Sequence, residues 1–176
     1  MLVGSYVGLR AIEKADLSQL LTWRNLPDYR QFFREYRELS MENQLVWFQD
    51  IVLKSSHTCM FSIVEREFGS LIGACGLCYI DWVNRNADFS IYIGENECYI
   101  DEKYAVDAAR LMMHYAKEEL GLHRLWAEIY DFDKKKKRLF STLHFQQEGI
   151  HKETHWSNGK WHDSLFYGWL AERDEI

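Results

Sequence analysis

Apolar residues return every three or four positions in several stretches of this chain, which is the period of an amphipathic helix. The clearest stretch covers residues 101–120, where Asp101 is placed to cap the start and Gly121 to end the helix. Asp16 and Ser40 are placed to cap two earlier helices. The shorter helices are predicted over residues 16–25, 40–52 and 134–143.

Other stretches have the properties of β-strands. Residues 71–79 are almost continuously apolar, which is typical of a central strand. Residues 87–94 alternate in part, with Phe89 and Ile91 on one face and Asp88 on the other. Mixed strands and helices in this order predict one α/β domain over residues 1–176. The predicted strands are 6–10, 59–65, 71–79, 87–94, 123–130, 145–156 and 161–170, the last two joined by a hairpin turn at Asn158-Gly159.

Composition limits the class of partner. The chain has 176 residues, 47% of them hydrophobic, which is enough for one sizeable core. Its net charge of -6 disfavours nucleic acid as a partner and suits amines or basic peptide ends. No apolar run approaches the roughly 18 residues of a membrane span, and no signal-peptide pattern begins the chain. We therefore expect a cytoplasmic protein with no membrane partner.

The cysteines do not form a metal-binding pattern. Cys75 and Cys78 have C-x-x-C spacing, but they lie inside an apolar run, and no second Cys/His pair has zinc-ligand spacing. We interpret them as reduced core residues and predict no metal site.

Three segments of the C-terminal half carry a family resemblance: Leu120–Tyr130, Asp133–Phe145 and the turn Asn158–Asp163. Together they resemble the GNAT N-acetyltransferases, most closely the branch that includes ribosomal-protein N-terminal acetyltransferases. Shorter matches, such as Trp23-Arg24-Asn25 and Ile91-Tyr92-Ile93-Gly94, extend the resemblance over nearly the whole chain. It implies a single domain with about four helices on a mixed, mostly antiparallel sheet of about seven strands.

The resemblance also implies acetyl-CoA as the cosubstrate and a primary amine as the acceptor. The amine would belong to a peptide N-terminus, a polyamine or an amino sugar. In such enzymes the strand that matches residues 87–94 splays from the strand that matches 125–130, and the pantetheine arm lies in the gap. Backbone groups of Ile91, Tyr92 and Ile93 would then bind this arm.

The start of the longest helix would lie at the phosphates of CoA, which makes Tyr104 and Ala105 the implied contacts. The family has a glycine-containing loop at this point, whereas this chain has no glycine between residues 95 and 120. A helix start binds anions through its free N–H groups. Here Asp101 would place its own carboxylate on those groups, and Glu102 adds a second negative charge. Both would weaken the usual hold on a pyrophosphate.

A basic run, Lys134–Lys137, begins the helix that borders the CoA nucleotide in the family. A charge run is usually a solvated face, but this one could hold phosphates by charge where the glycines are missing. Neighbouring residues lie about 100° apart around a helix, so at most two of the four lysines should touch a ligand. Lys134 and Lys137 are the expected contacts. Asp133 aligns with a family asparagine that contacts the cofactor.

The sequence lacks one of the groups that the family uses to transfer protons. Phe140 replaces the tyrosine that usually donates a proton to the leaving CoA thiolate, and phenylalanine has no exchangeable proton. His144 has an imidazole that could donate a proton, but its spacing from Phe140 does not place it at the same point. Asp88 occupies a position that often holds glutamate and is the candidate general base; the alternative is a structural or exposed acid. His155 and His162 flank the final hairpin and are interpreted as surface residues.

These features leave two hypotheses. The first is an N-acetyltransferase in which a neutral amine attacks acetyl-CoA directly. The second is a GNAT-fold binding or regulatory protein that has lost catalysis, which the missing loop glycines and Phe140 favour. The rest of the pattern favours the enzyme. The expected partners are small-molecule or peptide amines, and the expected oligomeric state is a monomer or a homodimer.

Overall fold

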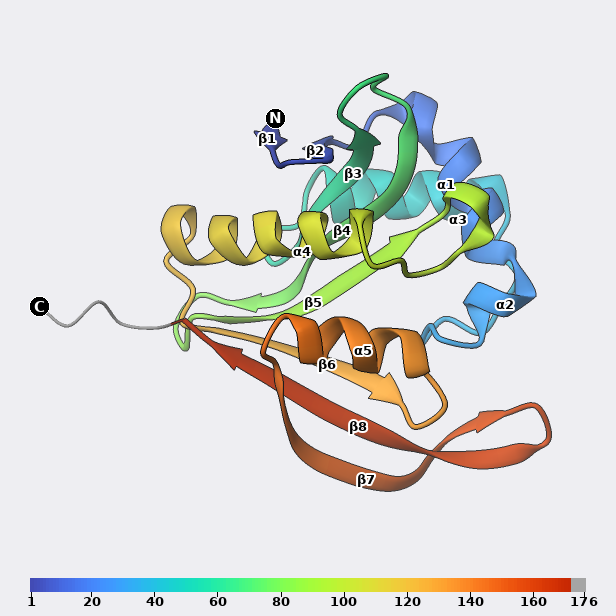
Figure 1. The fold of residues 1–176 in the computed structure, drawn as a ribbon. Coiled ribbons are helices and arrows are strands. Elements are labelled where there is room, and N and C mark those ends of the chain that lie inside the picture. The colour runs from blue at the N-terminus through green and yellow to red at the C-terminus, as the bar shows by residue number, and fades with distance from the viewer. Residues whose placement is uncertain (172–176) are drawn as a thin grey trace, which may run out of the picture.

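One mixed sheet of eight strands runs through the computed structural model, which describes residues 1–171 (Figure 1). The order is β1-β2-β3-β4-β5-β6-β8-β7. Neighbouring strands are antiparallel except β5 and β6, which run parallel. The predicted α/β fold is therefore confirmed. The strands are β1 (Leu2–Val3), β2 (Val7–Ala11), β3 (Cys59–Glu65), β4 (Leu71–Asp81), β5 (Asn86–Ile93), β6 (Arg124–Tyr130), β7 (Gln146–Ser157) and β8 (Lys160–Leu170).

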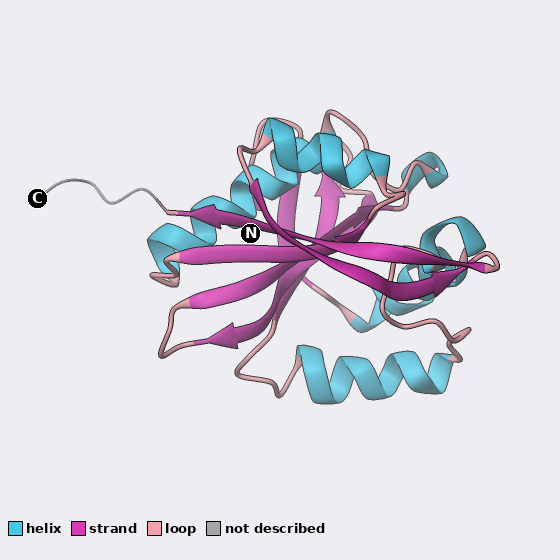
Figure 2. Ribbon diagram, turned by 90° about the horizontal axis from the view of Figure 1, so that it is seen from below, coloured by secondary structure: helices cyan, strands magenta, loops and turns pink. Residues whose placement is uncertain are grey.

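Helices cover both faces of this sheet, with α4 and α5 on one face and α1 and α3 on the other (Figures 1 and 2). None of the helices within residues 1–171 combines the length and the apolar character needed to cross a bilayer. The helices are α1 (Leu17–Asn25), α2 (Pro27–Arg30), α3 (Met41–Trp47), α4 (Tyr104–His114) and α5 (Lys134–Thr142). α3 and α4 continue into π-helical turns at Phe48–Val52 and Tyr115–Glu119, and 3-10 turns occur at Lys14–Asp16 and Glu95–Glu97.

The prediction of about seven strands and about four helices missed β1 and α2. β1 has two residues and α2 has four, which is too short for either period to appear in the sequence. The hairpin prediction is confirmed, because β7 and β8 pair across Asn158 and Gly159, both of which have positive φ.

Two of the predicted helix ends are confirmed. The Ser40 hydroxyl accepts a hydrogen bond from the Asn43 N–H at 3.2 Å and caps α3. Gly121 has a φ of +64°, the left-handed conformation that ends a helix at low steric cost.

The predicted cap at Asp16 is wrong. Its carboxylate accepts hydrogen bonds from Arg10 at 2.6 and 2.8 Å and from the Ser62 hydroxyl at 2.7 Å, and it makes no side-chain cap on α1. Burial alone would raise the pKa of Asp16, but the hydrogen bonds from Arg10, the Glu13 N–H and Ser62 outweigh it and lower the pKa to about 2. Asp16 therefore joins α1 to β2 and β3 as a buried ion.

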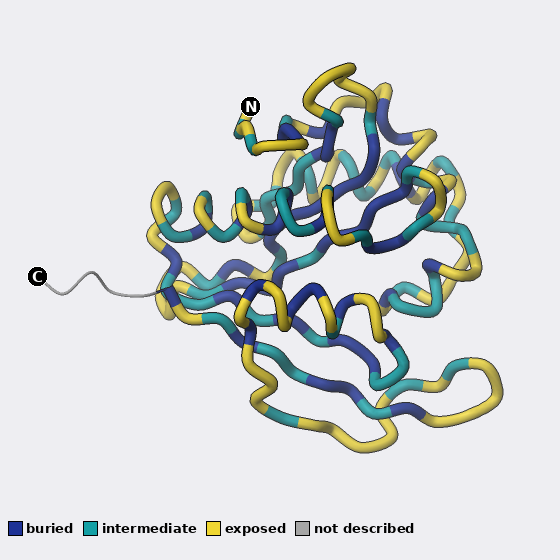
Figure 3. Tube along the Cα trace, viewed as in Figure 1, coloured by how far each residue is buried: buried dark blue, intermediate teal, exposed yellow. Residues whose placement is uncertain are grey.

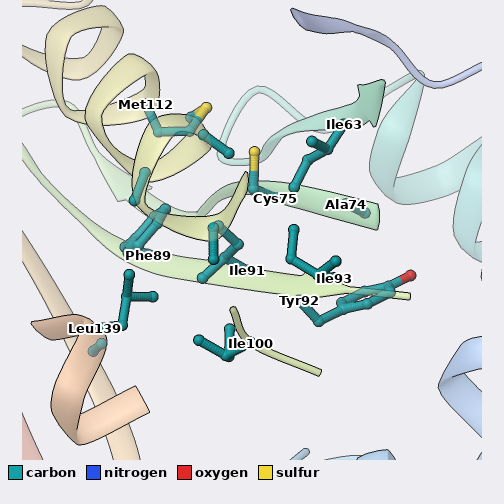
Figure 4. Close-up of a cluster of buried hydrophobic side chains, with 14 of the residues drawn as sticks. Ile63, Ala74, Cys75, Phe89, Ile91, Tyr92, Ile93, Ile100, Met112 and Leu139 are labelled. Carbon is teal, nitrogen blue, oxygen red and sulfur yellow. The ribbon is translucent and has the colours of Figure 1, made fainter. Parts of the chain in front are cut away.

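The core lies along the central strands, where the buried trace follows β4, β5 and β6 (Figure 3). Phe89 and Ile91 of β5 gather with Cys75 of β4 and Met112 of α4 in one buried cluster (Figure 4). Burial raises the pKa of the Cys75 thiol, so this cysteine is a protonated core residue, as the apolar run predicts. The α4 face of β5 is thus held by apolar packing.

Candidate active site

β5 and β6 separate in the middle of the sheet. Their parallel pairing covers Asn86 with Arg124, Ala87 with Leu125 and Asp88 with Trp126, and it ends there. The rest of β5 leaves β6 and follows β4 alone. The predicted splay is therefore present, and it opens a gap beside residues 89–93.

The register of β5 on β4 decides which backbone groups face this gap. The Gly94 N–H donates to the Ile72 carbonyl at 2.7 Å, and antiparallel bonding then alternates along the strand. By this alternation Tyr92 bonds to β4, whereas the N–H and C=O of Ile91 point toward the gap. Of the three predicted pantetheine contacts, the geometry thus favours Ile91.

The backbone of Ile93 is engaged within the chain. Its N–H donates to the Tyr99 carbonyl at 2.7 Å, and its carbonyl accepts from the Tyr29 hydroxyl at 2.6 Å. The Tyr29 oxygen in turn accepts from the Tyr99 N–H at 2.7 Å. This buried junction closes the gap at its far end, so Ile93 marks the boundary of the site.

The start of α4 is capped by the chain itself, as predicted. Asp101 accepts hydrogen bonds from the N–H groups of Tyr104 at 2.9 Å and Ala105 at 2.7 Å. The donors implied as phosphate contacts are therefore occupied by a carboxylate, and the positive end of the helix dipole is offset locally. Glu102 is 78% exposed and forms an ion pair with Arg138 at 2.8 Å.

A cavity of about 670 Å³ lies between the start of α4 and α5. Four cationic side chains line it: Arg110 from α4, and Lys134, Lys135 and Arg138 from α5. The two acidic residues of the α4 start also line it. Cations thus surround the cavity where the family resemblance implies the phosphates of CoA.

The side chains of the four lysines lie on different sides of α5, as helix geometry predicts. Lys134 and Lys135 line the cavity, while the Lys137 ammonium donates to the Asp131 carbonyl at 2.7 Å. Lys136 is buried over the Tyr99 ring, with 5.5 Å from the ammonium to the ring centre. Lys137 was a predicted contact; its side chain does not line this cavity, whereas that of Lys135 does.

The sequence interpretation missed Arg110, and it placed Arg138 in the basic run without naming it as an expected contact. Arg138 stands four residues after Lys134, which puts both on one face of α5. That spacing is a signal that could have found it. Arg110 joins the cavity only because α4 and α5 pack side by side, which no local pattern predicts.

Asp133 and Phe140 lie inside the fold. Asp133 accepts from the Lys136 N–H at 2.9 Å, which caps α5, and from the Tyr99 hydroxyl at 2.8 Å. Phe140 is 1% exposed and stacks on Phe145 with ring centres 5.0 Å apart. Asp133 is thus placed as a structural cap, and Phe140 as a core residue.

The histidines are placed differently from the surface interpretation. His162 is buried, and its Nδ1 lies 2.8 Å from the Asp131 carboxylate. The His155 ring stacks on Tyr130 with centres 3.6 Å apart. The prediction that both are surface residues is therefore wrong, because the hairpin folds their rings against the end of β6. His144 is exposed on the loop after α5.

Asp88 is buried at the point where β5 and β6 part. It accepts a hydrogen bond from Arg34 at 2.7 Å, and the same guanidinium donates to Glu128 at 3.1 Å. Burial raises the pKa of Asp88, and the attraction of Arg34 lowers it only in part. A small cavity of about 170 Å³ includes all three side chains in its lining. Sequence reasoning missed Arg34 and Glu128, because they are separated from Asp88 by 54 and 40 residues.

A second large cavity, of about 600 Å³, lies on the opposite face of the sheet, between α1, α3 and strands β3 to β5. We call it the acceptor cavity. It shares Arg24, Cys78 and Ser90 with the small cavity that contains Asp88. The two cavities therefore adjoin each other at these three residues.

Comparison with known proteins identifies the family. Residues 7–146 match the family model described as an acetyltransferase (GNAT) domain. An uncharacterised N-acetyltransferase of Bacillus licheniformis, p20, is 23% identical over 92% of this chain and 91% of its own length. YdaF of Bacillus subtilis, a candidate ribosomal N-acetyltransferase, is 31% identical over 61% of this chain and 57% of its own length.

The fold also matches solved structures. A spermidine N-acetyltransferase from Vibrio cholerae, solved with CoA and spermine, superposes with a TM-score of 0.84 at 22% identity. The match covers 93% of this chain and 95% of that one. At this identity the similarity establishes the fold, whereas the acceptor of this chain has to be inferred from its own residues.

Proposed function

The chain belongs to the GNAT acetyltransferase family and takes acetyl-CoA as its cosubstrate, and from this we propose that it acetylates a primary amine held in the acceptor cavity. The observation that carries the proposal is the arrangement around the β5–β6 gap. A cationic cavity lies on the α4–α5 face, the acceptor cavity lies on the other, and the small cavity that contains Asp88 adjoins the acceptor cavity.

The pantetheine arm would lie in the gap and bond to the backbone of Ile91. The N–H groups on this part of β5 would polarise the thioester carbonyl and stabilise the oxyanion that forms when the amine attacks. The amine nitrogen forms a bond to the carbonyl carbon, the carbon–sulfur bond breaks, and CoA leaves as a thiolate. As the intermediate collapses, the nitrogen gives its extra proton to water, and the thiolate takes a proton from water, because Phe140 has none to give.

Asp88 is proposed as the base that removes a proton from the ammonium form of the acceptor, directly or through water. Its buried carboxylate lies beside Arg34, and its raised pKa makes it a better proton acceptor than an ordinary aspartate. Arg34 would hold the carboxylate in position and would have to share it with the incoming ammonium.

The phosphates of CoA are proposed to bind in the cavity between α4 and α5. Lys134, Lys135, Arg110 and Arg138 would supply the positive charge that the capped α4 start does not. This substitution of side-chain cations for loop N–H groups favours the enzyme over the binding-only alternative. We expect looser binding than a glycine-containing loop gives, because Asp101 and Glu102 border the same cavity.

The test is acetyl transfer by the purified protein to a panel of amines, followed through release of the CoA thiol. We expect amine-dependent thiol release with acetylated amine as product. Thiol release that no amine accelerates, together with no detectable binding of acetyl-CoA, would contradict the proposal and support the binding or regulatory alternative.

A further inference from the structure

Arg24 is a charged residue of the acceptor cavity that the proposed reaction does not use. It occupies the last turn of α1, between Trp23, which packs against Gly94, and Asn25. Asn25 exchanges two hydrogen bonds with the backbone of Leu39, at 2.8 and 2.9 Å. Both neighbours are therefore fixed, and Arg24 is held toward the cavity that it lines.

The guanidinium of Arg24 has no polar partner among residues 1–171. It lies over the Phe33 ring, 3.9 Å from the ring centre, and makes neither a hydrogen bond nor an ion pair with the described residues. Stacking on a ring uses the face of a guanidinium and leaves the N–H groups at its edge free. Burial lowers the pKa of Arg24, but an arginine stays charged at neutral pH.

Gln44 adds a second unused polar group. Gln44 is 4% exposed and lines the same cavity, yet its side-chain amide makes no hydrogen bond within the described part of the chain. Arg24 and Gln44 thus offer polar groups that have no partner among residues 1–171 to the same cavity, and a polar ligand would pair with both. Ser90 extends the cavity toward Asp88.

The carboxylates of the acceptor cavity are already neutralised. Glu35 bonds to Arg37 at 2.7 and 2.9 Å, and these hydrogen bonds lower the pKa of Glu35 to about 2. Asp50 pairs with Lys54 at 2.8 Å. Arg24 is therefore the charged lining residue that has no direct ion pair, and its positive charge is unfavourable for a polycation.

On this basis, and resting on the proposed acetyl transfer, we propose that the acceptor is an amine that also carries an oxyanion, a carboxylate or a phosphate, bound by the free edge of Arg24 with Gln44 beside it. The oxyanion would fix one end of the acceptor at Arg24, and the amine would reach through the shared wall toward Asp88. This selects amino acids, peptides or phosphorylated amino sugars as the class of substrate and rejects polyamines.

The first experiment compares matched acceptors in the wild-type protein and in Arg24→Gln. The pairs are glycylglycine with its C-terminal amide, and glucosamine 6-phosphate with glucosamine; spermidine is the polycation. In the wild type we expect kcat/KM at least about 10-fold higher for the oxyanion member of a pair, the size of a charge-assisted hydrogen bond. The pair that shows the difference identifies carboxylate or phosphate.

Arg24→Gln should remove that preference and leave the KM for acetyl-CoA unchanged. The matched control is Arg30→Gln, since Arg30 is a nearby arginine that pairs with Glu38 at 3.5 Å and does not line the cavity. Equal rates within both pairs, a preference for spermidine, or an unchanged preference in Arg24→Gln would overturn the inference. In each of these cases acetyl transfer itself would still stand.

A binding experiment tests the inference without requiring acetyl transfer. Inorganic pyrophosphate and malonate are titrated by calorimetry into CoA-saturated protein, so that the α4–α5 cavity is already filled. We expect at least one of them to bind about 10-fold more weakly to Arg24→Gln than to the wild type or to Arg30→Gln. Identical binding by all three proteins would overturn the inference. A failure of CoA to bind would count against the proposed function instead.

Discussion

The two large cavities beside the β5–β6 gap hold their positive charge in different ways. In the α4–α5 cavity the cations are exposed and already have partners within the chain. Arg138 is 76% exposed and pairs with Glu102, and the Lys135 ammonium donates to the Cys98 carbonyl at 2.5 Å. In the acceptor cavity, Arg24 is stacked on Phe33 and makes no ion pair with the described residues.

This difference indicates how each cavity would recognise a ligand. Exposed charges give weak contacts that salt screens over about 8–10 Å, so a cluster of them suits a ligand with several phosphates. A half-buried guanidinium with no ion pair gives a charge-assisted contact that salt screens less. We propose that the first arrangement would provide affinity for CoA and the second would provide selection among acceptors.

The largest effect should come from Asp88, which lines the small cavity beside the acceptor cavity. Asp88→Asn removes the proposed base, and we expect kcat to fall about 100-fold with little change in the affinity for acetyl-CoA. Because burial raises the pKa of Asp88, the wild-type rate should fall, as pH decreases, at a higher pH than an ordinary aspartate would give.

Steady-state rates measured over about pH 6 to 9 check this prediction, with Asp28→Asn as the control because Asp28 is exposed on α2. Equal rates for Asp88→Asn and the wild type over that range would remove Asp88 as the base. The carboxylate would then serve only to hold Arg34.

A smaller effect should separate the cations that line the α4–α5 cavity from those that do not. Lys135→Ala and Arg138→Ala should each raise the Kd for CoA about 3- to 10-fold, and the loss should shrink at high salt. Lys137→Ala is the matched control, because its ammonium bonds to the Asp131 carbonyl outside the cavity. If all three variants bind CoA like the wild type, the basic run is a solvated face.

The smallest effect should follow from freeing the start of α4. Replacing Asp101-Glu102-Lys103 with Gly-Lys-Gly releases the N–H groups of Tyr104 and Ala105 and removes two negative charges. We expect CoA to bind about threefold more tightly, while loss of the cap lowers the free energy of unfolding by about 1 kcal/mol.

Calorimetry and urea unfolding measure both quantities for this variant. Ser40→Ala is its control, since it removes a comparable cap from α3 and should cost about 1 kcal/mol without changing CoA affinity. An unchanged or weaker Kd in a folded Gly-Lys-Gly variant would show that Asp101 does not compete with phosphate.

The fold was predictable from the sequence wherever the signal is local. The period of α4, the alternation of β5 and the turn at Asn158-Gly159 each lie within a few residues of chain, and all three are confirmed. The carboxylate of Asp101 on the start of α4 was also predictable, because a capping residue acts on N–H groups three and four positions away.

The parts that could not be predicted depend on contacts between distant residues. Asp16 was assigned a local cap, but Arg10 and Ser62 hold it in the core once β2 and β3 have paired. Arg34 reaches Asp88 only through the fold. The sequence also could not predict that the edge of the Arg24 guanidinium is free. That depends on the Glu35 carboxylate accepting hydrogen bonds from Arg37 instead. The predicted monomer or homodimer stays a prediction.

The most direct test is a calorimetric titration of the protein with acetyl-CoA at about 50 mM and about 500 mM salt. We predict a one-site isotherm at low salt and an affinity at least about 10-fold weaker at high salt, because exposed side chains replace the helix start as the phosphate site. Flat heats at millimolar acetyl-CoA would contradict the proposed enzyme. Tight binding that salt does not change would contradict the cationic phosphate site.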